Sequence, residues 1–193
     1  MSEQSSSLNS IISPEIKNDE FYDYIQRIAQ EENIKYILEI GSSSGEGSTE
    51  AFVKGIRNNP NQPTLFCMEV SQIRFEQLNK RYEKDEFIKC YNVSSVSLDK
   101  FPDQTDVIEF YNQQQSGLNY YPLEQVLGWL QQDIEYIKSS QVETNGIAKI
   151  KQDHNIDYFD VVLIDGSEFT GVSELKEVYG ANLILLDDTS NIP

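Results

Sequence analysis

Short apolar runs alternate with amphipathic stretches along most of the chain. Strand-like runs occupy residues 36–40, 64–70, 87–93, 158–165 and 181–188. The second is almost continuously apolar, which is typical of strands buried on both faces of a parallel sheet, and the fourth is the clearest strand of the chain. Helical spacing of apolar residues follows the first two runs, recurs over residues 121–137, and marks a short helix near residues 173–179. This alternation predicts an α/β fold: a Rossmann-like, open, mostly parallel sheet of about five strands with helices on both faces.

The pattern is weaker at the start of the chain and in its middle. Residues 1–13 are rich in Ser, Asn and Gln, which predicts a flexible tail ahead of a single domain over residues 14–193. Ser13-Pro14-Glu15 has the form of a helix start, with Ser as the N-cap and Pro at the first helical position. The polar segment 98–119 receives no assignment, and residues 98–155 hold no motif that identifies a substrate.

A turn rich in glycine and serine follows the first predicted strand. Gly41, Gly45 and Gly47 are spaced Gly-x-x-x-Gly-x-Gly, and a predicted helix begins directly afterwards. Small residues let the backbone approach a ligand, and the first turn of a helix offers unpaired N–H groups. The spacing differs from the Gly-x-Gly-x-x-Gly that seats a dinucleotide pyrophosphate. The turn therefore predicts a nucleotide-binding crevice that differs from the dinucleotide-binding type.

Acidic residues close four of the predicted strands. They are Glu39, Glu69, Asp165 and the pair Asp187-Asp188. Because the carboxyl ends of parallel strands share one edge of the sheet, where ligands bind in such folds, we expect these acids to gather at one site. The alternative for any one of them is an ordinary strand-terminating or helix-capping acid.

Charge and composition restrict the partners. The 193 residues include 15 Lys and Arg against 32 Asp and Glu, for a formal charge of -17, and the isoelectric point is about 4.3. Such a chain lacks the basic face that tracks phosphates, so we expect no nucleic-acid partner and no attraction to an anionic membrane. The apolar runs are shorter than a membrane span, and no signal-peptide pattern opens the chain. Cys67 and Cys90 both fall within strands and are predicted to be core thiols, which together with these features suits a reducing cytoplasm.

From Tyr36 to Thr189 the sequence resembles class I S-adenosylmethionine-dependent methyltransferases. Their first motif, an acid followed by Gly-x-Gly-x-Gly, is matched by Glu39 to Gly45 with Ser43 at the middle glycine. The resemblance implies that the turn packs against the methionine part of S-adenosylmethionine and that Glu69 binds the ribose hydroxyls. The implied cofactor residues are Glu39, Gly41, Ser42, Ser43, Gly45, Glu69, Ser94 and Ser95.

The carboxyl ends of the last two strands are similar to metal-dependent O-methyltransferases of the macrocin and catechol type. This similarity implies that Asp165, Asp187 and Asp188 hold Mg²⁺ beside a substrate hydroxyl. In the macrocin-like members Asp-Gly-Asp ends the fourth strand and its second Asp is the general base. Here the tripeptide is Asp165-Gly166-Ser167, followed by Glu168, so the implied catalytic residues are Asp165, Ser167 and Glu168. The only histidine, His154, is predicted to lie on the surface.

The family sheet has seven strands, whereas this sequence offers about five. The expectation is therefore a C-terminally truncated member whose exposed sheet edge is covered by a second copy or a partner chain. The predicted function is O-methylation of a small hydroxylated metabolite or sugar-containing natural product. One alternative is a non-catalytic module, related to the methyltransferases, that binds the cofactor or a partner. A nicotinamide-dependent oxidoreductase is a further alternative, because Glu69 also suits the ribose of that cofactor.

Overall fold

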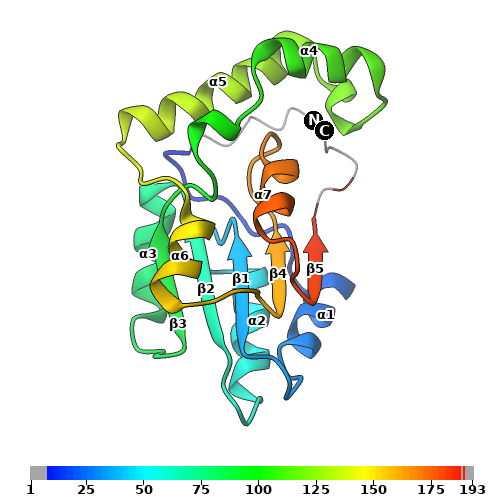
Figure 1. The fold of residues 1–193 in the computed structure, drawn as a ribbon. Coiled ribbons are helices and arrows are strands. Elements are labelled where there is room, and N and C mark those ends of the chain that lie inside the picture. Colours follow the sequence, from blue (N-terminus) through cyan, green and yellow to red (C-terminus); the bar gives the residue numbers. More distant parts are fainter. Residues whose placement is uncertain (1–7, 188, 190–193) are drawn as a thin grey trace.

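The strands form one parallel sheet. The computed structural model describes residues 8–187 and residue 189, and within them five strands pair in the order β3-β2-β1-β4-β5, all parallel. Figure 1 shows the strands pointing toward the same edge. The strand bounds are β1 Tyr36–Ile40, β2 Thr64–Glu69, β3 Ile88–Asn92, β4 Val161–Ile164 and β5 Leu183–Leu186. The predicted Rossmann-like α/β fold is confirmed.

Both faces of the sheet are buried. Along β1, Ile37 faces one core and Leu38 the other, and Val161 and Val162 of β4 divide in the same way. This alternation follows from the two-residue period of a strand, and it explains why apolar side chains fill almost every strand position. Helices α1, α2 and α3 cover the first face, whereas α6 and α7 cover the second, as Figure 1 also shows. Helices on both faces were predicted.

The helices of the described residues begin and end close to several of the predicted positions. Their bounds are α1 Glu20–Ile28, α2 Ser48–Arg57, α3 Gln72–Tyr82, α4 Gln104–Gln113, α5 Leu123–Ser139, α6 Gly146–His154 and α7 Gly171–Glu177, with short 3₁₀ turns η1 Leu98–Lys100 and η2 Gly117–Tyr120. The helix start predicted at Ser13 is wrong. Asn18 has a positive φ of 56°, and the Asp19 carboxylate caps α1 by accepting the Tyr22 N–H at 2.8 Å.

The middle of the chain forms a cap over the sheet edge; its helix α5 was predicted over residues 121–137, whereas the part before it, residues 98–119, was left unassigned. Figure 1 shows α4 and α5 beyond the tips of the strands, on the side to which the strands point. Residues of α4, η2 and α5 pack around their own small core. Helix α6 was not predicted. His154, its last residue, was predicted to lie on the surface and is half-buried: its ring packs against Phe66 with centroids 4.7 Å apart, and its Nε2 is 2.7 Å from the Tyr91 hydroxyl.

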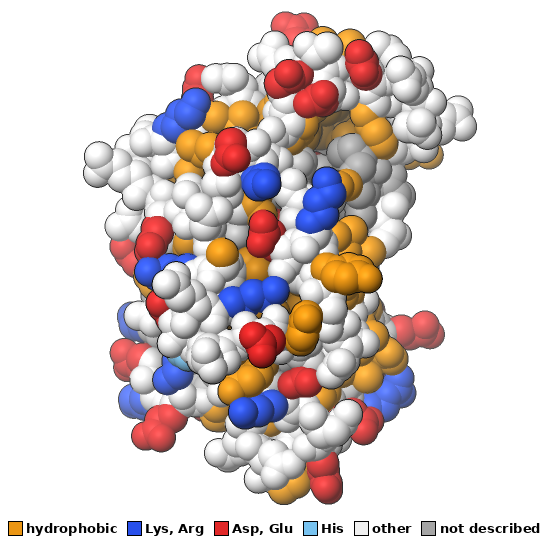
Figure 2. Space-filling view, viewed as in Figure 1, with side chains coloured by type: hydrophobic (Ala, Val, Ile, Leu, Met, Phe, Trp, Pro, Cys, Tyr) orange, Lys and Arg blue, Asp and Glu red, His pale blue; other side chains and the backbone are white. Residues whose placement is uncertain are grey.

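The cysteines and the surface agree with the composition. Cys67 is buried, Cys90 is half-buried, and both are free thiols in neighbouring strands. On the face shown in Figure 2, basic side chains lie scattered among acidic ones and form no continuous patch. None of the helices in residues 8–187 is long and apolar enough to cross a membrane.

Candidate functional site

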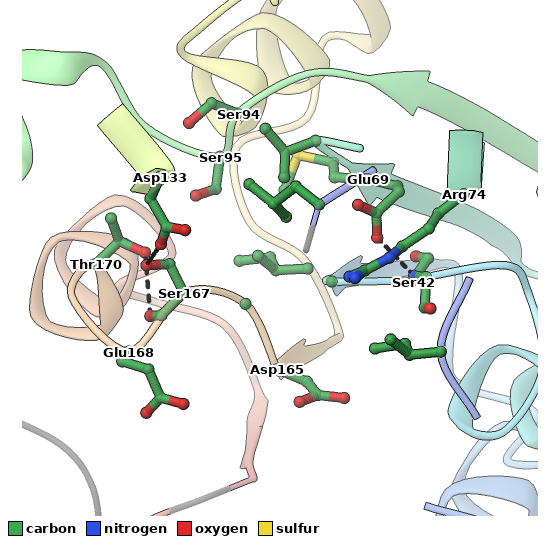
Figure 3. Close-up of a pocket in the computed structure, with 18 of the residues that line it drawn as sticks. Ser42, Glu69, Arg74, Ser94, Ser95, Asp133, Asp165, Ser167, Glu168 and Thr170 are labelled. Atoms are coloured by element: carbon green, nitrogen blue, oxygen red, sulfur yellow. Dashed lines mark hydrogen bonds between the residues drawn. The ribbon is translucent and has the colours of Figure 1, made fainter. Parts of the chain in front are cut away.

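A cavity of about 530 Å³ lies at the edge to which the strands point. Its walls come from the turn after β1, the ends of β2 and β3, the loop after β4, helix α5 and the segment before α1. Figure 3 shows Ser42, Glu69 and Arg74 on one side of the cavity and Asp133, Ser167 and Thr170 on the other, with further polar side chains such as Ser95 and Asp165 around it. The cavity therefore has two chemically distinct ends, which we call the Glu69 end and the Asp133 end.

The turn after β1 lies against the neighbouring strands. Gly41 and Ser42 both donate their N–H groups to the Met68 carbonyl, each at 3.0 Å. Gly41 has φ +87°, and a Cβ there would lie 1.7 Å from the Asp165 carbonyl oxygen, so only glycine fits. Ser43, at the position of the family's middle glycine, takes the left-handed φ of 48°. Gly41, Ser42 and Ser43, three of the residues predicted to bind a cofactor, all line the cavity.

Two residues predicted to bind a cofactor lie outside the cavity lining. Glu39 is fully buried on the opposite face of β1, where the Thr49 hydroxyl donates to its Oε2 at 2.7 Å. Burial raises the pKa of this carboxyl group. Gly45 packs on α3, and its carbonyl accepts the Tyr82 hydroxyl at 2.5 Å. Both residues support the turn from behind, because strand alternation turns Glu39 away from the face that carries Leu38 and Ile40.

Glu69 ends β2 and is 4% exposed. Its Oε2 accepts the Ser43 N–H at 2.8 Å, and its Oε1 accepts the Ser71 N–H at 2.7 Å. Burial is the largest influence and raises the pKa of Glu69, although these N–H groups and the charge of Arg74 oppose it. A carboxylate offers about four lone-pair directions. Two are used by the backbone, so each oxygen retains capacity for a ligand hydroxyl.

The segment before α1 closes the Glu69 end of the cavity. The Ser71 hydroxyl donates to the Leu8 carbonyl at 2.5 Å, and the Arg74 Nε donates to the Ser10 carbonyl at 2.9 Å. Leu8, Ile12 and Ser13 line the cavity. Residues 8–13 thus belong to the folded domain and not to the flexible tail predicted for 1–13; residues 1–7 lie outside the described residues. Neither Arg74 nor this segment was identified from the sequence.

The Asp133 end joins helix α5 to the loop after β4. The Ser167 hydroxyl donates to Asp133 Oδ2 at 2.7 Å, and Figure 3 shows this bond between the two elements. Burial raises the pKa of Asp133, while the Ser167 bond and the charge of Arg74 oppose the shift. Asp133 was not predicted. It sits in an amphipathic helix whose polar positions have no distinguishing spacing, and its partner is 34 residues away.

A second acid lies beneath the same loop. Glu174 of α7 is 1% exposed, and its Oε1 accepts hydroxyl hydrogen bonds from Ser95 (2.5 Å) and Thr170 (2.8 Å). Its Oε2 is buried without a hydrogen-bond partner among the described residues. Burial raises the pKa of this carboxyl group. Ser95, predicted to flank a cofactor, therefore lines the cavity with its hydroxyl already engaged, while the Ser94 hydroxyl donates to the Val96 carbonyl.

The acids predicted to hold a metal are not assembled by the described residues. Asp165 and Glu168 line the cavity, whereas Asp187 does not, and Asp188 lies outside the described residues. Within residues 8–187 and 189, no three His, Cys, Asp or Glu side chains come together as a metal site. The magnesium site stays a prediction.

Comparison with known proteins adds no assignment. The sequence matches no model of a known protein family, and no curated protein matches it either. The cavity and the motifs that form it are therefore the features that bear on function.

Proposed function

We propose that the protein is an S-adenosylmethionine-dependent methyltransferase that acts on a hydroxyl group of a small metabolite or sugar-containing natural product. The observation that carries this proposal is the pairing of Glu69 with the turn after β1. A buried carboxylate with two remaining acceptor sites suits a ribose diol, because both hydroxyls can donate to it. Gly41, Ser42 and Ser43 of that turn line the same cavity beside the carboxylate, where the rest of the cofactor would lie.

The residues at the Glu69 end fit S-adenosylmethionine better than a dinucleotide. The turn lacks the third glycine of the Gly-x-Gly-x-x-Gly pattern that seats a pyrophosphate. When bound, S-adenosylmethionine supplies a methyl group on a positively charged sulfur. The chain then has to place an acceptor oxygen in line with that methyl group and exclude water. A cavity roofed by α5 and closed by residues 8–16 supports this role.

Magnesium assistance is part of the sequence-based prediction, but no step proposed here depends on it. The non-catalytic alternative shares the cofactor site and differs only in turnover. The oxidoreductase alternative differs in the cofactor itself. A measurement of which cofactor binds therefore distinguishes it from both the methyltransferase and the non-catalytic module.

Titration calorimetry with S-adenosylmethionine and with NAD⁺ tests the proposal. We expect micromolar binding of S-adenosylmethionine to the wild-type protein, and a loss of about tenfold or more, roughly 1.4 kcal/mol, in Glu69→Ala. Glu69→Gln retains one accepting oxygen, so its affinity should fall between the two. Glu86→Ala, an exposed acid outside the cavity, is the matched control and should bind like the wild type.

Two results would contradict the proposal: equal affinity of wild type and Glu69→Ala for S-adenosylmethionine, or tighter binding of NAD⁺ than of S-adenosylmethionine. Thermal unfolding of each variant shows whether a loss of binding reflects loss of the fold.

A further inference from the structure

We infer that Asp133 and Ser167 form the subsite that binds the hydroxyl group of the methyl acceptor, and that Asp133 takes its proton. This inference rests on the proposed methyltransferase function and assigns the acceptor half of the cavity. Its starting point is the hydrogen bond between Ser167 Oγ and Asp133 Oδ2, which joins the loop after β4 to the roof of the cavity.

The course of α5 places Asp133 away from the Glu69 end. Near the end of this helix, the Tyr136 hydroxyl accepts the Gln72 N–H at 2.9 Å, which fixes that part of α5 over the start of α3, just beyond β2. One turn earlier, Asp133 reaches the loop that follows β4. Figure 3 shows Asp133 and Glu69 on opposite sides of the cavity. A ligand seated on Glu69 therefore leaves the Asp133 end open to a second molecule.

The Asp133 carboxylate has acceptor capacity left over. Ser167 occupies one lone pair of Oδ2, and no hydrogen bond joins Oδ1 to another of the described residues. The Ser167 hydroxyl donates to Asp133, and its oxygen accepts the Phe169 N–H at 3.3 Å, which leaves one of its two lone pairs for a ligand. A hydroxyl placed between them donates to the acid, and Ser167 fixes the orientation of that acid. The pair thus supplies the carboxylate that the tripeptide Asp165-Gly166-Ser167 lacks at its third position.

Aromatic side chains beside Asp133 indicate what carries the hydroxyl. Trp129 lies one turn before Asp133 on the same helix, and its ring packs edge-on against Tyr121 with centroids 4.8 Å apart. Trp129, Tyr121 and the largely buried Phe169 all line the cavity. Flat aromatic surfaces next to one oriented carboxylate favour a ring that bears a hydroxyl group.

The proposed step balances within the bound pair of substrates. The acceptor O–H bond breaks, and its proton moves to Asp133. The acceptor oxygen forms a bond to the methyl carbon as the carbon–sulfur bond breaks, and that electron pair stays on sulfur. Asp133 later returns the proton to water. Burial favours this role, because a carboxylate with a raised pKa holds a proton more strongly.

A pair of ring compounds tests the subsite: 2-naphthol and 2-methoxynaphthalene, in which a methyl group replaces the hydroxyl proton. Their binding is measured by saturation-transfer NMR on protein saturated with S-adenosylhomocysteine. The wild type should bind 2-naphthol at least about tenfold more tightly than its methyl ether. Asp133→Asn should reduce 2-naphthol affinity by about tenfold, and Ser167→Ala should weaken it less. Glu135→Gln makes the same acid-to-amide change on an exposed position of α5 and should have no effect.

The outcomes separate the two proposals. If S-adenosylhomocysteine does not bind the wild type, the proposed function is wrong. If it binds but both naphthalenes bind alike, or Asp133→Asn binds 2-naphthol like the wild type, the acceptor subsite is wrong and the cofactor site stands. The comparison of the two ligands on the wild type needs no variant, so a misfolded Asp133→Asn would not remove the test. If Asp133→Asn binds S-adenosylhomocysteine with wild-type affinity, its loss of 2-naphthol affinity arises in the acceptor half of the cavity.

Discussion

Replacement of Gly41 by alanine should destabilise the protein strongly, because two costs coincide at this position. At φ +87° an L-residue is strained, by about 1–2 kcal/mol. The new Cβ would also lie 1.7 Å from the Asp165 carbonyl oxygen, a backbone atom that cannot rotate away. To relieve this contact, the turn after β1 has to separate from the end of β4. That movement loosens the hydrogen bond from the Asp165 N–H to the Ile40 carbonyl, worth about 1 kcal/mol.

Together these terms predict a loss of about 3 kcal/mol in the free energy of unfolding. With a urea m-value of about 2 kcal/mol/M, the midpoint of unfolding should fall by roughly 1.5 M. The measurement is urea denaturation followed by circular dichroism. Gly128→Ala is the matched control, since a Cβ at Gly128 meets no atom within 4 Å in the exposed interior of α5. It should stabilise the protein by up to about 1 kcal/mol through helix propensity.

The opposite signs make the comparison decisive. A Gly41→Ala protein that loses less than about 1 kcal/mol would show that the turn can move away from β4 at little cost. In that case the close approach of the two backbones would not explain the glycine. The same loss in Gly128→Ala would show that the measurement reports something other than local geometry.

Two further predictions concern the buried acids. Thr49→Val keeps the shape of the side chain but removes the hydroxyl that donates to Glu39 Oε2, so urea denaturation should show a loss of about 1–3 kcal/mol; an unchanged midpoint would contradict a role for this bond. The pKa of Glu174 is raised in the folded protein above its unfolded value near 4.5. Between these two pKa values the native state binds more protons than the unfolded state. The free energy of unfolding therefore falls as the pH rises through this range. Glu174→Gln should therefore flatten the pH dependence of the unfolding free energy above pH 4.5, and equally steep profiles for the two proteins would refute the assignment.

The sheet could be predicted because its signal is local and repeated. Each strand is a short apolar run, and burial on both faces requires nearly every position to be apolar. Helix α6 was missed because only Ile147 and Ile150 of its nine residues are buried apolar side chains, too few to establish a helical period. The start of α1 was misplaced because Ser13-Pro14 has the composition of a helix start. In the folded chain these two residues line the cavity instead.

The two ends of the cavity differ in how far apart their residues lie in the sequence. The Glu69 end is formed by one contiguous turn and by the end of β2, and the parallel register that pairs Ile40 with Met68 brings Glu69 beside that turn. Two buried strands recognised in the sequence are therefore enough to predict that these residues lie together. The directions of Glu39 and Gly45 were misjudged, since Glu39 alternates to the other face of β1 and Gly45 packs on α3. Arg74 and the segment before α1 were missed because they reach this end only through tertiary contacts.

The Asp133 end depends on tertiary contacts between distant residues, which no local sequence pattern indicates. Asp133 meets Ser167 only because α5 crosses the strand tips at one rotation about its axis, fixed in part by the Tyr136 bond to Gln72, 64 residues away. A rotation of one residue, about 100°, would carry Asp133 out of the cavity. The proposed acceptor subsite thus depends on how the cap docks on the sheet, whereas the proposed cofactor subsite depends on the sheet itself. Changes in the packing core of α4, η2 and α5 should therefore alter acceptor binding while cofactor binding, held by β1 and β2, remains.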